Sequence, residues 1–590
     1  MVLAGPGSGK TTVITQRVWN LIHMYGADPA SILVITFTKA AAREMKERFC
    51  RMAGEHLPVT FGTFHAVFFM ILKYAYGYRG SDIVGEEERF AFMRREIARR
   101  HLETEDENDL ISSVLAEIGT VKNSDLDLSH YYASSCGQDV FRSLFDSYQR
   151  FLNRNHRIDF EDMLLYCREL LEQRPDILAG WQRRFPYILI DEFQDINQVQ
   201  YEVIRLLAGS TQNLFLVGDD DQSVYRFRGA KPEIMLHVKD DFPALETVTL
   251  GINYRCPPEI VEPAGRLIAH NTVRFPKTFS AAGGRSGAVR CLTFEGQREE
   301  SQYLAQVIRK QHARGVPYRD MAVLCRTNRQ PRRLMEFLMR FNIPFCTKDR
   351  VPDLYDHWVV KDVLCYIRIA RGSRDRADFL RIMNRPKRYL SRDSLPAEQV
   401  DLEAWERYYK DMDWMRQRVR KLASDLSMIK HLSPFAAINY IRKAVDYEGY
   451  LRETARERKI DYAELEEILD ELQAGAKSFD TFEDWKSHIE AVRAEMRRQR
   501  TASGQREDAV VISTLHAAKG LEYEQVYIPD VNEGILPYRK SLLNADIEEE
   551  RRLLYVGMTR AKSHLTLCTC RMINNHEALP SRFLEELKTE

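Results

Sequence analysis

The stretch that decides the fold stands at the start of the chain and reads Ala4-Gly5-Pro6-Gly7-Ser8-Gly9-Lys10-Thr11-Thr12. The apolar residues Val2 and Leu3 before it predict a short buried strand, and the residues after the last glycine predict a helix from Thr11 onward. Glycines let a backbone turn wrap around a phosphate and aim its N–H groups at it. In such a loop the lysine pairs with the β- and γ-phosphates, and the hydroxyl of the first threonine binds Mg²⁺. The stretch therefore predicts a phosphate loop, and Ala4, where the strict pattern has glycine, is a small departure from it.

A second buried strand is predicted at residues 187–190, and two carboxylates follow it directly, Asp191 and Glu192. Asp191 can hold the Mg²⁺ of a phosphate loop, and Glu192 can act as a base or orient the attacking water. A solvated acidic turn is the alternative interpretation, and the phosphate loop at the start of the chain makes it much weaker.

A third predicted strand, residues 214–217, leads into a turn that carries Gln222, Tyr225, Phe227 and Arg228. An amide, aromatic rings and arginines just beyond a strand suit phosphate sensing and base stacking. A surface turn with core aromatics is the alternative for this segment when it is considered alone.

The composition is that of a large folded protein without an overall charge bias. The chain has 590 residues, 44% of them hydrophobic and 29% charged, which suggests about four domains of ordinary size. Lys+Arg and Asp+Glu are both 86, so any surface that binds an anion such as nucleic acid must be local. No apolar run approaches the roughly 18 residues of a membrane-spanning helix, no secretory signal opens the chain, and the cysteines are scattered. We therefore expect a cytoplasmic protein with reduced thiols and no membrane partner.

The order of the remaining segments predicts two α/β cores, each interrupted by a mainly helical insertion. Further short apolar runs at 32–37, 322–324, 510–512 and 525–528 are typical of buried parallel strands, whereas charged segments of helical period, such as 462–472, separate them. The predicted boundaries are 1–77 and 156–248 for the first core, 78–155 for its insertion, 249–349 and 508–590 for the second core, and 350–507 for its insertion. Ser503 and Gly504 are expected to form a hinge.

Taken together and in this order, these segments resemble the UvrD/Rep/PcrA family of superfamily-one DNA helicases. The resemblance runs from residue 2 to about residue 584, and the further segments that carry it are residues 35–38, 63–65, 159–164, 253–255, 325–328, 511–522 and 548–561. It implies an α/β protein with two RecA-like P-loop cores built on parallel sheets, which clamp one ATP with Mg²⁺ between them.

The resemblance also implies a role for each residue of the nucleotide site. The phosphate loop would bind ATP, Thr11 and Asp191 would hold Mg²⁺, Tyr254 would stack on the adenine, and Glu522 would contact the ribose. The residues that would take part in hydrolysis are Lys10, Glu192 and Gln222 of the first core and Arg255 and Arg560 of the second. The chemistry agrees, because phosphoryl transfer needs positive charge on the equatorial oxygens, and an arginine from a partner domain makes hydrolysis depend on closure.

By the same resemblance, a track for single-stranded DNA crosses both cores. It would be lined by Phe37, His65, Phe227, Arg228, Arg326, Asn328 and His516. Aromatic faces stack on any base, which is worth about 1–3 kcal/mol per base without sequence preference. Opening and closing of the cleft once per ATP would step the strand. The family implies 3′ to 5′ movement, with single-strand/duplex junctions as substrates and repair or replication proteins as partners.

Two of the departures from the family pattern concern adenine recognition and the contact with duplex DNA. Family members carry a segment upstream of the phosphate loop, with a glutamine that recognises adenine, and we expect such an N-terminal piece to be missing here. Residues 384–391 resemble the duplex-contacting motif of the second insertion, but Tyr389 and Ser391 stand where the family has glycines, so close approach of a duplex phosphate is less easy. Residues 371–400 still hold eight Lys/Arg against four Asp/Glu, a local basic patch.

The leading hypothesis is therefore an ATP-dependent DNA helicase, a DNA-dependent ATPase that converts hydrolysis into strand separation. A single-strand translocase that unwinds poorly alone is the first alternative, favoured by the altered duplex motif. A nucleotide-gated DNA-binding subunit of a repair or defence complex is the second. The intact Glu192, Gln222, Arg255 and Arg560 speak against a subunit with little turnover.

Overall fold

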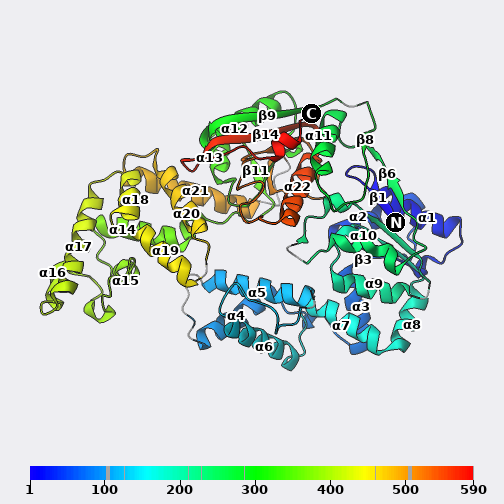
Figure 1. Ribbon diagram of the computed structural model, residues 1–590, viewed down its shortest axis with the longest axis horizontal. Helices are drawn as coiled ribbons and strands as arrows, with labels where there is room; N and C mark the ends of the chain where they lie inside the picture. The colour runs from blue at the N-terminus through cyan, green and yellow to red at the C-terminus, as the bar shows by residue number, and fades with distance from the viewer. Residues whose placement is uncertain are drawn as a thin grey trace.

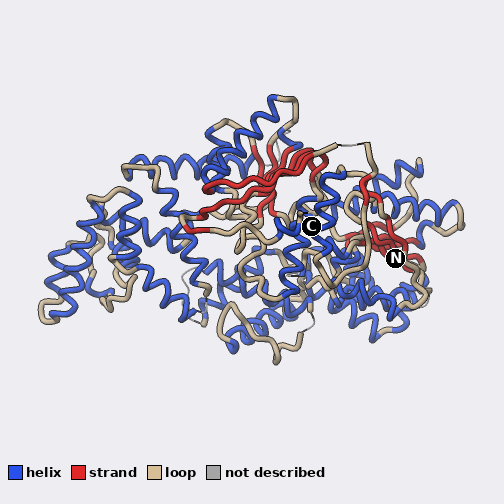
Figure 2. Tube along the Cα trace, turned by 45° about the horizontal axis from the view of Figure 1, so that its top comes forward, coloured by secondary structure: helices blue, strands red, loops and turns tan. Residues whose placement is uncertain are grey.

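The computed structural model describes residues 1–100, 102, 107–124, 126–209, 211–226, 229–284, 286–458, 460–502 and 508–588. These residues form two large sheets with helices packed on their faces, a small sheet of the two strands β7 Ile252–Asn253 and β8 Ser280–Ala281, and two groups of helices that extend away from the large sheets (Figure 1). Figure 2 shows the strands gathered in two places, with helices around each of them. The predicted α/β fold with parallel sheets is confirmed.

The first sheet has six strands in the order β3-β2-β4-β5-β1-β6, all of them parallel. The strands are β1 Val2–Ala4, β2 Ile32–Thr36, β3 Thr60–Thr63, β4 Tyr187–Ile190, β5 Leu214–Gly218 and β6 Val248–Leu250. The predicted strands at 32–37, 187–190 and 214–217 are confirmed as β2, β4 and β5. Because β1 lies between β5 and β6, the phosphate loop follows an internal strand, at the carboxyl ends of the strands, where ligands bind in open α/β sheets.

Both faces of the first sheet are covered, which explains its continuous apolar strands. Val2 and Ala4 pack with helices α1 and α2 on one face, and Leu3 between them packs with α3, α7 and α9 on the other. The helices of this core are α1 Lys10–His23, α2 Lys39–Ala53, α3 Phe64–Tyr76, α7 Phe160–Gln173, α8 Pro175–Arg184, α9 Gln198–Ala208 and α10 Pro232–Asp241.

The second sheet has seven strands, of which only β15 runs antiparallel. Its strands are β9 Ala288–Gly296, β10 Met321–Cys325, β11 Phe345–Thr347, β12 Val510–Thr514, β13 Tyr523–Ile528, β14 Ala561–Ile573 and β15 His576–Glu577. The helices of this core are α11 Pro258–Ala269, α12 Gln297–Ala313, α13 Arg332–Arg340, α22 Asn544–Met558 and α23 Phe583–Glu586. The predicted strands at 322–324, 510–512 and 525–528 are confirmed as β10, β12 and β13. The long pair β9 and β14 was not predicted, because polar residues interrupt its apolar ones.

Two groups of helices interrupt the cores, and each buries a hydrophobic core of its own. The first group is α4 Glu86–Arg99, α5 Glu107–Asn123 and α6 Gln138–Arg154. The second is α14 Trp358–Ala370, α15 Arg376–Ile382, α16 Leu402–Tyr408, α17 Asp413–Lys430, α18 Pro434–Lys443, α19 Tyr447–Arg458, α20 Tyr462–Ala476 and α21 Phe482–Ala502. The helix predicted at 462–472 is confirmed as α20, and the hinge predicted at Ser503 and Gly504 lies outside the described residues. The exact domain boundaries stay predictions.

Among the described residues, no helix combines the length and the apolar character that crossing a lipid bilayer requires.

Candidate functional site

The phosphate loop adopts its turn through two glycines with left-handed backbone. Gly7 has φ 67° and Gly9 has φ 88°, conformations that side-chain-bearing residues rarely adopt. The Ser8 hydroxyl closes the turn by donating to the Gly5 carbonyl over 2.8 Å. Ala4 ends strand β1 in register with Leu250 and is fully buried, so this position needs no glycine. Helix α1 begins at Lys10, one residue before the predicted start.

The second core contacts the phosphate loop directly. A Cβ atom on Gly7 would lie 2.6 Å from Cβ of Arg255 and 2.7 Å from Oδ1 of Asn253, so Gly7 is required for space as well as for its φ angle. The Tyr254 N–H donates to the Gly7 carbonyl over 3.0 Å, while 61% of Tyr254 remains exposed to solvent. The segment 253–255 therefore forms a second wall beside the loop and leaves one aromatic ring free to stack on a base.

The two carboxylates after β4 occupy different environments. Asp191 is buried, and its Oδ1 has no hydrogen-bond partner among the described residues. Glu192 has a left-handed backbone, φ 51°, and its Oε2 lies 3.8 Å from Lys10 Nζ and accepts a 2.5 Å hydrogen bond from Gln194. A glutamate in this conformation carries backbone strain, and such strain clusters at functional sites.

The pKa values of the two carboxylates are shifted in opposite directions. Burial, with the adjacent charge of Glu192, raises the pKa of Asp191 to about 7. Burial also disfavours ionisation of Glu192, but the cations of Lys10 and Lys519 outweigh it and lower the pKa of Glu192 to about 2. Glu192 is therefore ionised, whereas for Asp191 burial and the charge of Glu192 outweigh the attraction of Lys10 and Lys519.

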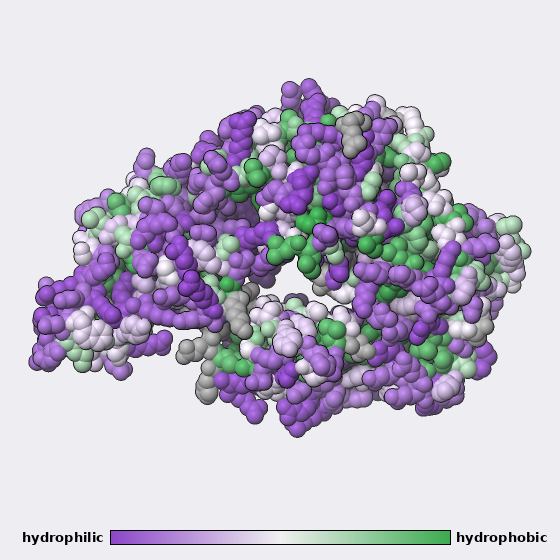
Figure 3. Space-filling view, viewed as in Figure 1, coloured by the Kyte–Doolittle hydropathy of each residue, from purple (hydrophilic) through white to green (hydrophobic). Residues whose placement is uncertain are grey.

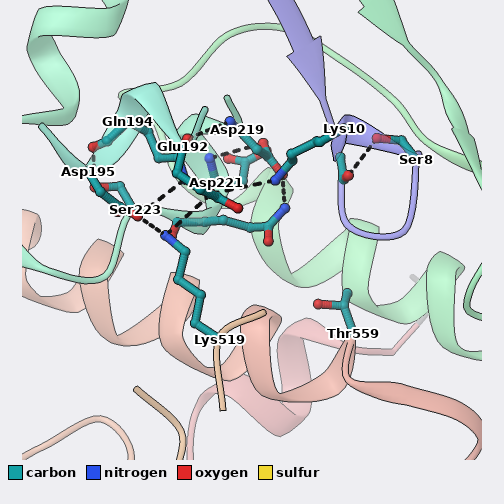
Figure 4. A network of polar contacts seen from close by, with 12 residues as sticks. Ser8, Lys10, Glu192, Gln194, Asp195, Asp219, Asp221, Ser223, Lys519 and Thr559 are labelled. Carbon is teal, nitrogen blue, oxygen red and sulfur yellow. Dashed lines mark hydrogen bonds and ion pairs between the residues drawn. The ribbon is translucent and has the colours of Figure 1, made fainter. Parts of the chain in front are cut away.

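Lys519 joins the two cores at this site, which the sequence did not predict (Figure 4). It follows β12 in the second core, yet its Nζ binds the Asp195 carboxylate, donates to the Gln222 carbonyl over 2.7 Å and lies 3.9 Å from Glu192. Its side chain is only 7% exposed. Lys519 belongs to the segment 511–522 that resembles the family, but its position in the sequence does not show which residues of the other core it contacts.

Arg560 also enters the cleft from the second core and is held in a fixed orientation. Its Nε donates to the Val556 carbonyl over 2.8 Å and its Nη1 to the Leu521 carbonyl over 3.3 Å. Its Nη2 then lies 3.5 Å from Oε1 of Gln222 in the first core. Burial and the nearby Arg255 cation lower the pKa of Arg560 to about 9. A buried cation that lies between two cores suits an anionic ligand in the cleft.

The remaining residues predicted for the nucleotide lie at the rim of this cleft. Arg255 donates to Glu522 over 2.8 Å and to the Thr559 carbonyl over 3.3 Å. Glu522 also pairs with Lys562 over 2.6 Å and is partly exposed. Thr11 lies in the first turn of α1, next to Thr12, whose hydroxyl accepts a 3.2 Å hydrogen bond from Arg48.

The structure pairs Phe37, a residue of the predicted DNA track, with Tyr225, which lies in the turn after β5. The rings of Phe37 and Tyr225 are stacked, with centroids 5.4 Å apart and an interplanar angle of 9°. The Tyr225 hydroxyl donates to the carbonyl of His516 over 3.3 Å, and Lys519 Nζ lies 5.3 Å from the Tyr225 ring centroid. The same tyrosine therefore contacts a predicted DNA residue and the lysine of the nucleotide cleft.

The other described residues predicted for the DNA track each have protein partners. His65 meets the ring of Phe160 edge to face at 5.5 Å, and burial lowers the pKa of His65, which favours its neutral form. Arg326 forms a forked ion pair with Glu550, the shortest contact being 2.6 Å, and Asn328 donates to the backbone carbonyl of residue 350 over 3.0 Å. Phe227 and Arg228 lie outside the described residues.

An opening passes through the molecule between the first helical insertion and the second core (Figure 3). Apolar residues gather on the border of this opening, whereas most of the surface in this view is hydrophilic.

Comparison with known proteins places the whole chain in one family. Residues 1–243 match the UvrD/REP helicase N-terminal domain, and residues 248–572 match the UvrD-like helicase C-terminal domain. The ATP-dependent DNA helicase PcrA of Staphylococcus epidermidis is 31% identical over 625 residues, which cover 100% of this chain and 84% of that protein. The ATP-dependent DNA helicase Rep of Escherichia coli (strain K12) is 31% identical over 627 residues, which cover 100% of this chain and 91% of that protein. With both halves matched and cations from one core reaching carboxylates of the other, the chain belongs to the UvrD/REP helicase family.

Proposed function

We propose that the protein is an ATP-dependent DNA helicase in which closure of the two cores completes the catalytic site. The observation that carries this proposal is that Lys519 and Arg560 of the second core reach Asp195 and Gln222 of the first. Phosphoryl transfer is accelerated by positioning and by cations aimed at the transferred group. An enzyme that receives these cations from its second core hydrolyses ATP only when the cleft is closed, which couples hydrolysis to domain movement.

The residues of the first core fit ATP with Mg²⁺. Lys10 would pair with the β- and γ-phosphates, and Thr11 with Asp191 would hold the metal ion. The buried Asp191 Oδ1, which has no hydrogen-bond partner among the described residues, suits a hard divalent cation that prefers oxygen ligands. When bound, the ion would neutralise charge on the β- and γ-phosphate oxygens. Glu192, ionised beside Lys10, would orient or deprotonate the attacking water.

The rim of the cleft offers contacts for the nucleoside and the γ-phosphate. The exposed ring of Tyr254 lies beside the phosphate loop and would stack on the adenine. Glu522 would contact the ribose, and Arg255, which Glu522 holds over 2.8 Å, would contact the γ-phosphate together with Arg560.

The DNA track would run past the stacked rings of Phe37 and Tyr225. Bases stack on aromatic faces irrespective of sequence, as a motor that moves along any strand requires. Because Lys519 contacts both the Tyr225 ring and the nucleotide cleft, a change in the cleft would alter the grip on DNA. The remaining predicted contacts are His65, Phe227, Arg228, Arg326, Asn328 and His516. The family resemblance supports movement from 3′ to 5′, junctions of single-stranded and duplex DNA as substrates, and repair or replication proteins as partners.

The proposal is tested by steady-state ATP hydrolysis with and without single-stranded DNA, and by unwinding of duplexes that carry either a 3′ or a 5′ tail. We expect hydrolysis that DNA stimulates, that requires Mg²⁺ and stops in EDTA, and unwinding of the 3′-tailed duplex. Hydrolysis that DNA leaves unchanged would exclude a motor, and unwinding of only the 5′-tailed duplex would reverse the assigned direction.

One observation favours the alternative of a single-strand translocase that unwinds poorly. Tyr389, where the family has glycine, holds a left-handed backbone with φ 57° and is 66% exposed. Its ring lies under the guanidinium of Arg418, at 5.4 Å. The backbone conformation of glycine is thus kept, but a tyrosine ring projects where a duplex backbone would have to approach. Strong DNA-stimulated hydrolysis without unwinding of either tailed duplex would support this alternative.

The stacked pair yields a prediction for DNA binding. Phe37→Ala removes one of the two stacked rings, and we expect the affinity for single-stranded DNA to fall by about 10-fold, as for one lost base stack. The affinity is measured by fluorescence anisotropy with a labelled oligothymidylate. Tyr25→Ala, which removes an aromatic ring that is 67% exposed in the loop after α1, is the control and should leave the affinity unchanged. Equal affinities for Phe37→Ala and the unmodified protein would remove Phe37 from the DNA track.

A further inference from the structure

A short segment of the second core, residues 271–277, spans from helix α11 toward strand β8 (Ser280–Ala281) and is called the strap below. One side of the strap is bound to helix α22, which leads to Arg560. Asn271 donates to the Glu548 carbonyl over 3.0 Å and accepts from Arg551 over 2.6 Å. Arg552 donates to the backbone carbonyl of residue 273 over 2.9 Å. The strap is therefore tied by side-chain hydrogen bonds to the helix that leads to Arg560.

The other side of the strap forms ion pairs with the turn after β5 in the first core. This turn holds three consecutive buried carboxylates, Asp219, Asp220 and Asp221. Lys277 Nζ lies 3.1 Å from Asp219 and 2.9 Å from Asp221, and it also binds Asp220. Arg274 forms a forked pair with Asp221, at 2.9 and 2.7 Å. The Lys277 side chain is 0% exposed, so all of its charge is directed at this turn.

Asp219 connects this cluster to the catalytic glutamine. Burial opposes its ionisation, but the cation of Lys277 outweighs burial and lowers the pKa of Asp219. An ionised carboxylate can only accept hydrogen bonds, and Asp219 accepts one from Nε2 of Gln222 over 2.7 Å. The amide nitrogen of Gln222 is thereby occupied, and its Oε1 is the end that faces Arg560 at 3.5 Å.

We propose that Lys277 is a positioning residue for ATP hydrolysis, which holds Asp219 in place so that Asp219 fixes the orientation of Gln222 in the closed cleft. This inference rests on the proposed role of Gln222 at the γ-phosphate. It adds a contact that spans the two cores, in addition to those of Lys519 and Arg560. The competing interpretation is that the strap only joins the two cores and adds stability.

The first test separates kcat from KM for ATP. Lys277→Gln should lower kcat by about 10- to 100-fold, as for the loss of other supporting partners, with KM changed by less than about 3-fold. The matched control is Arg274→Gln, which removes a forked pair from the same strap but has no contact with Asp219 or Gln222. We expect kcat of the control to stay within about 3-fold of the unmodified protein at a similar loss of melting temperature. Equal losses of kcat in both variants would overturn the proposal.

A second variant keeps the test decisive if Lys277→Gln does not fold. Asp219→Ala removes the acceptor of Gln222 but leaves Lys277 and Arg274 balanced by Asp220 and Asp221. We expect the same selective loss of kcat for this variant.

A double-mutant comparison then shows whether the effect passes through the glutamine. In a Gln222→Ala background, Asp219→Ala should lower kcat by no more than about 2-fold further, because residues that act as a unit are not additive. A multiplicative loss would show that Asp219 acts independently of Gln222 and would overturn the inference, as would wild-type kcat for Gln222→Ala. If the unmodified protein shows no DNA-stimulated hydrolysis, the proposed function itself fails, which is a different result.

Discussion

Replacing Arg560 with lysine is expected to lower kcat of DNA-stimulated ATP hydrolysis by about 10³-fold or more, the range found for arginines supplied by a partner domain. The structure explains why lysine cannot substitute. The guanidinium of Arg560 is 1% exposed and makes two hydrogen bonds to backbone carbonyls while a third nitrogen faces Gln222. An ammonium group cannot satisfy these separate directions at once, because it is a compact charge on a flexible stem.

The measurement is kcat at saturating ATP and DNA, together with the affinity for a fluorescent ADP analogue. We expect the affinity to change little, because Arg560 acts on charge that develops in the transition state. Arg571→Lys is the matched control, since Arg571 lies on β14 with a 68% exposed side chain and pairs only with Glu295 among the described residues. If Arg560→Lys hydrolysed ATP at the wild-type rate, the second core would not supply the catalytic cation.

Glu192→Gln is expected to lower kcat by about 10²- to 10⁴-fold, which is the usual contribution of a positioned acid or base. The substitution keeps the size of the side chain but removes the negative charge that lies between Lys10 and Lys519, at 3.8 and 3.9 Å. The amide cannot accept a proton from water, whereas the neighbouring Asp191 is unchanged and still offers its oxygen to a metal ion. ATP binding should therefore persist while hydrolysis is lost.

Single-turnover hydrolysis and nucleotide binding, measured on the same preparation, distinguish loss of chemistry from loss of binding. Glu202→Gln serves as the control, because Glu202 is also a partly buried glutamate in an ion pair, at 2.9 Å from Arg168, but lies on helix α9. Hydrolysis by Glu192→Gln at the wild-type rate would assign the catalytic carboxylate elsewhere, and Asp195, bound to Lys519, would be the next candidate.

The local sequence predicted the buried strands of both sheets well, for a physical reason. Strands such as β4 and β10 are covered on both faces, so nearly every residue is apolar and the run is visible without knowing its neighbours. Strands such as β9 and β14 have exposed positions, so polar residues interrupt their apolar pattern. They pair at eight of the nine positions of β9 only because the chain brings them together from opposite ends of the second core.

By itself, the sequence determined the fold class, the phosphate loop and the types of residue that each strand end presents, because these depend on short segments whose chemistry is local. The roles of the individual site residues stay predictions until the variants are measured. Only the tertiary structure decided which of these residues act on one another. Lys519 and Asp195 are 324 positions apart, and Arg560 and Gln222 are 338 apart. Such pairs form because two separate sheets present their loops to one cleft, where burial strengthens the attraction between charges that no local pattern connects.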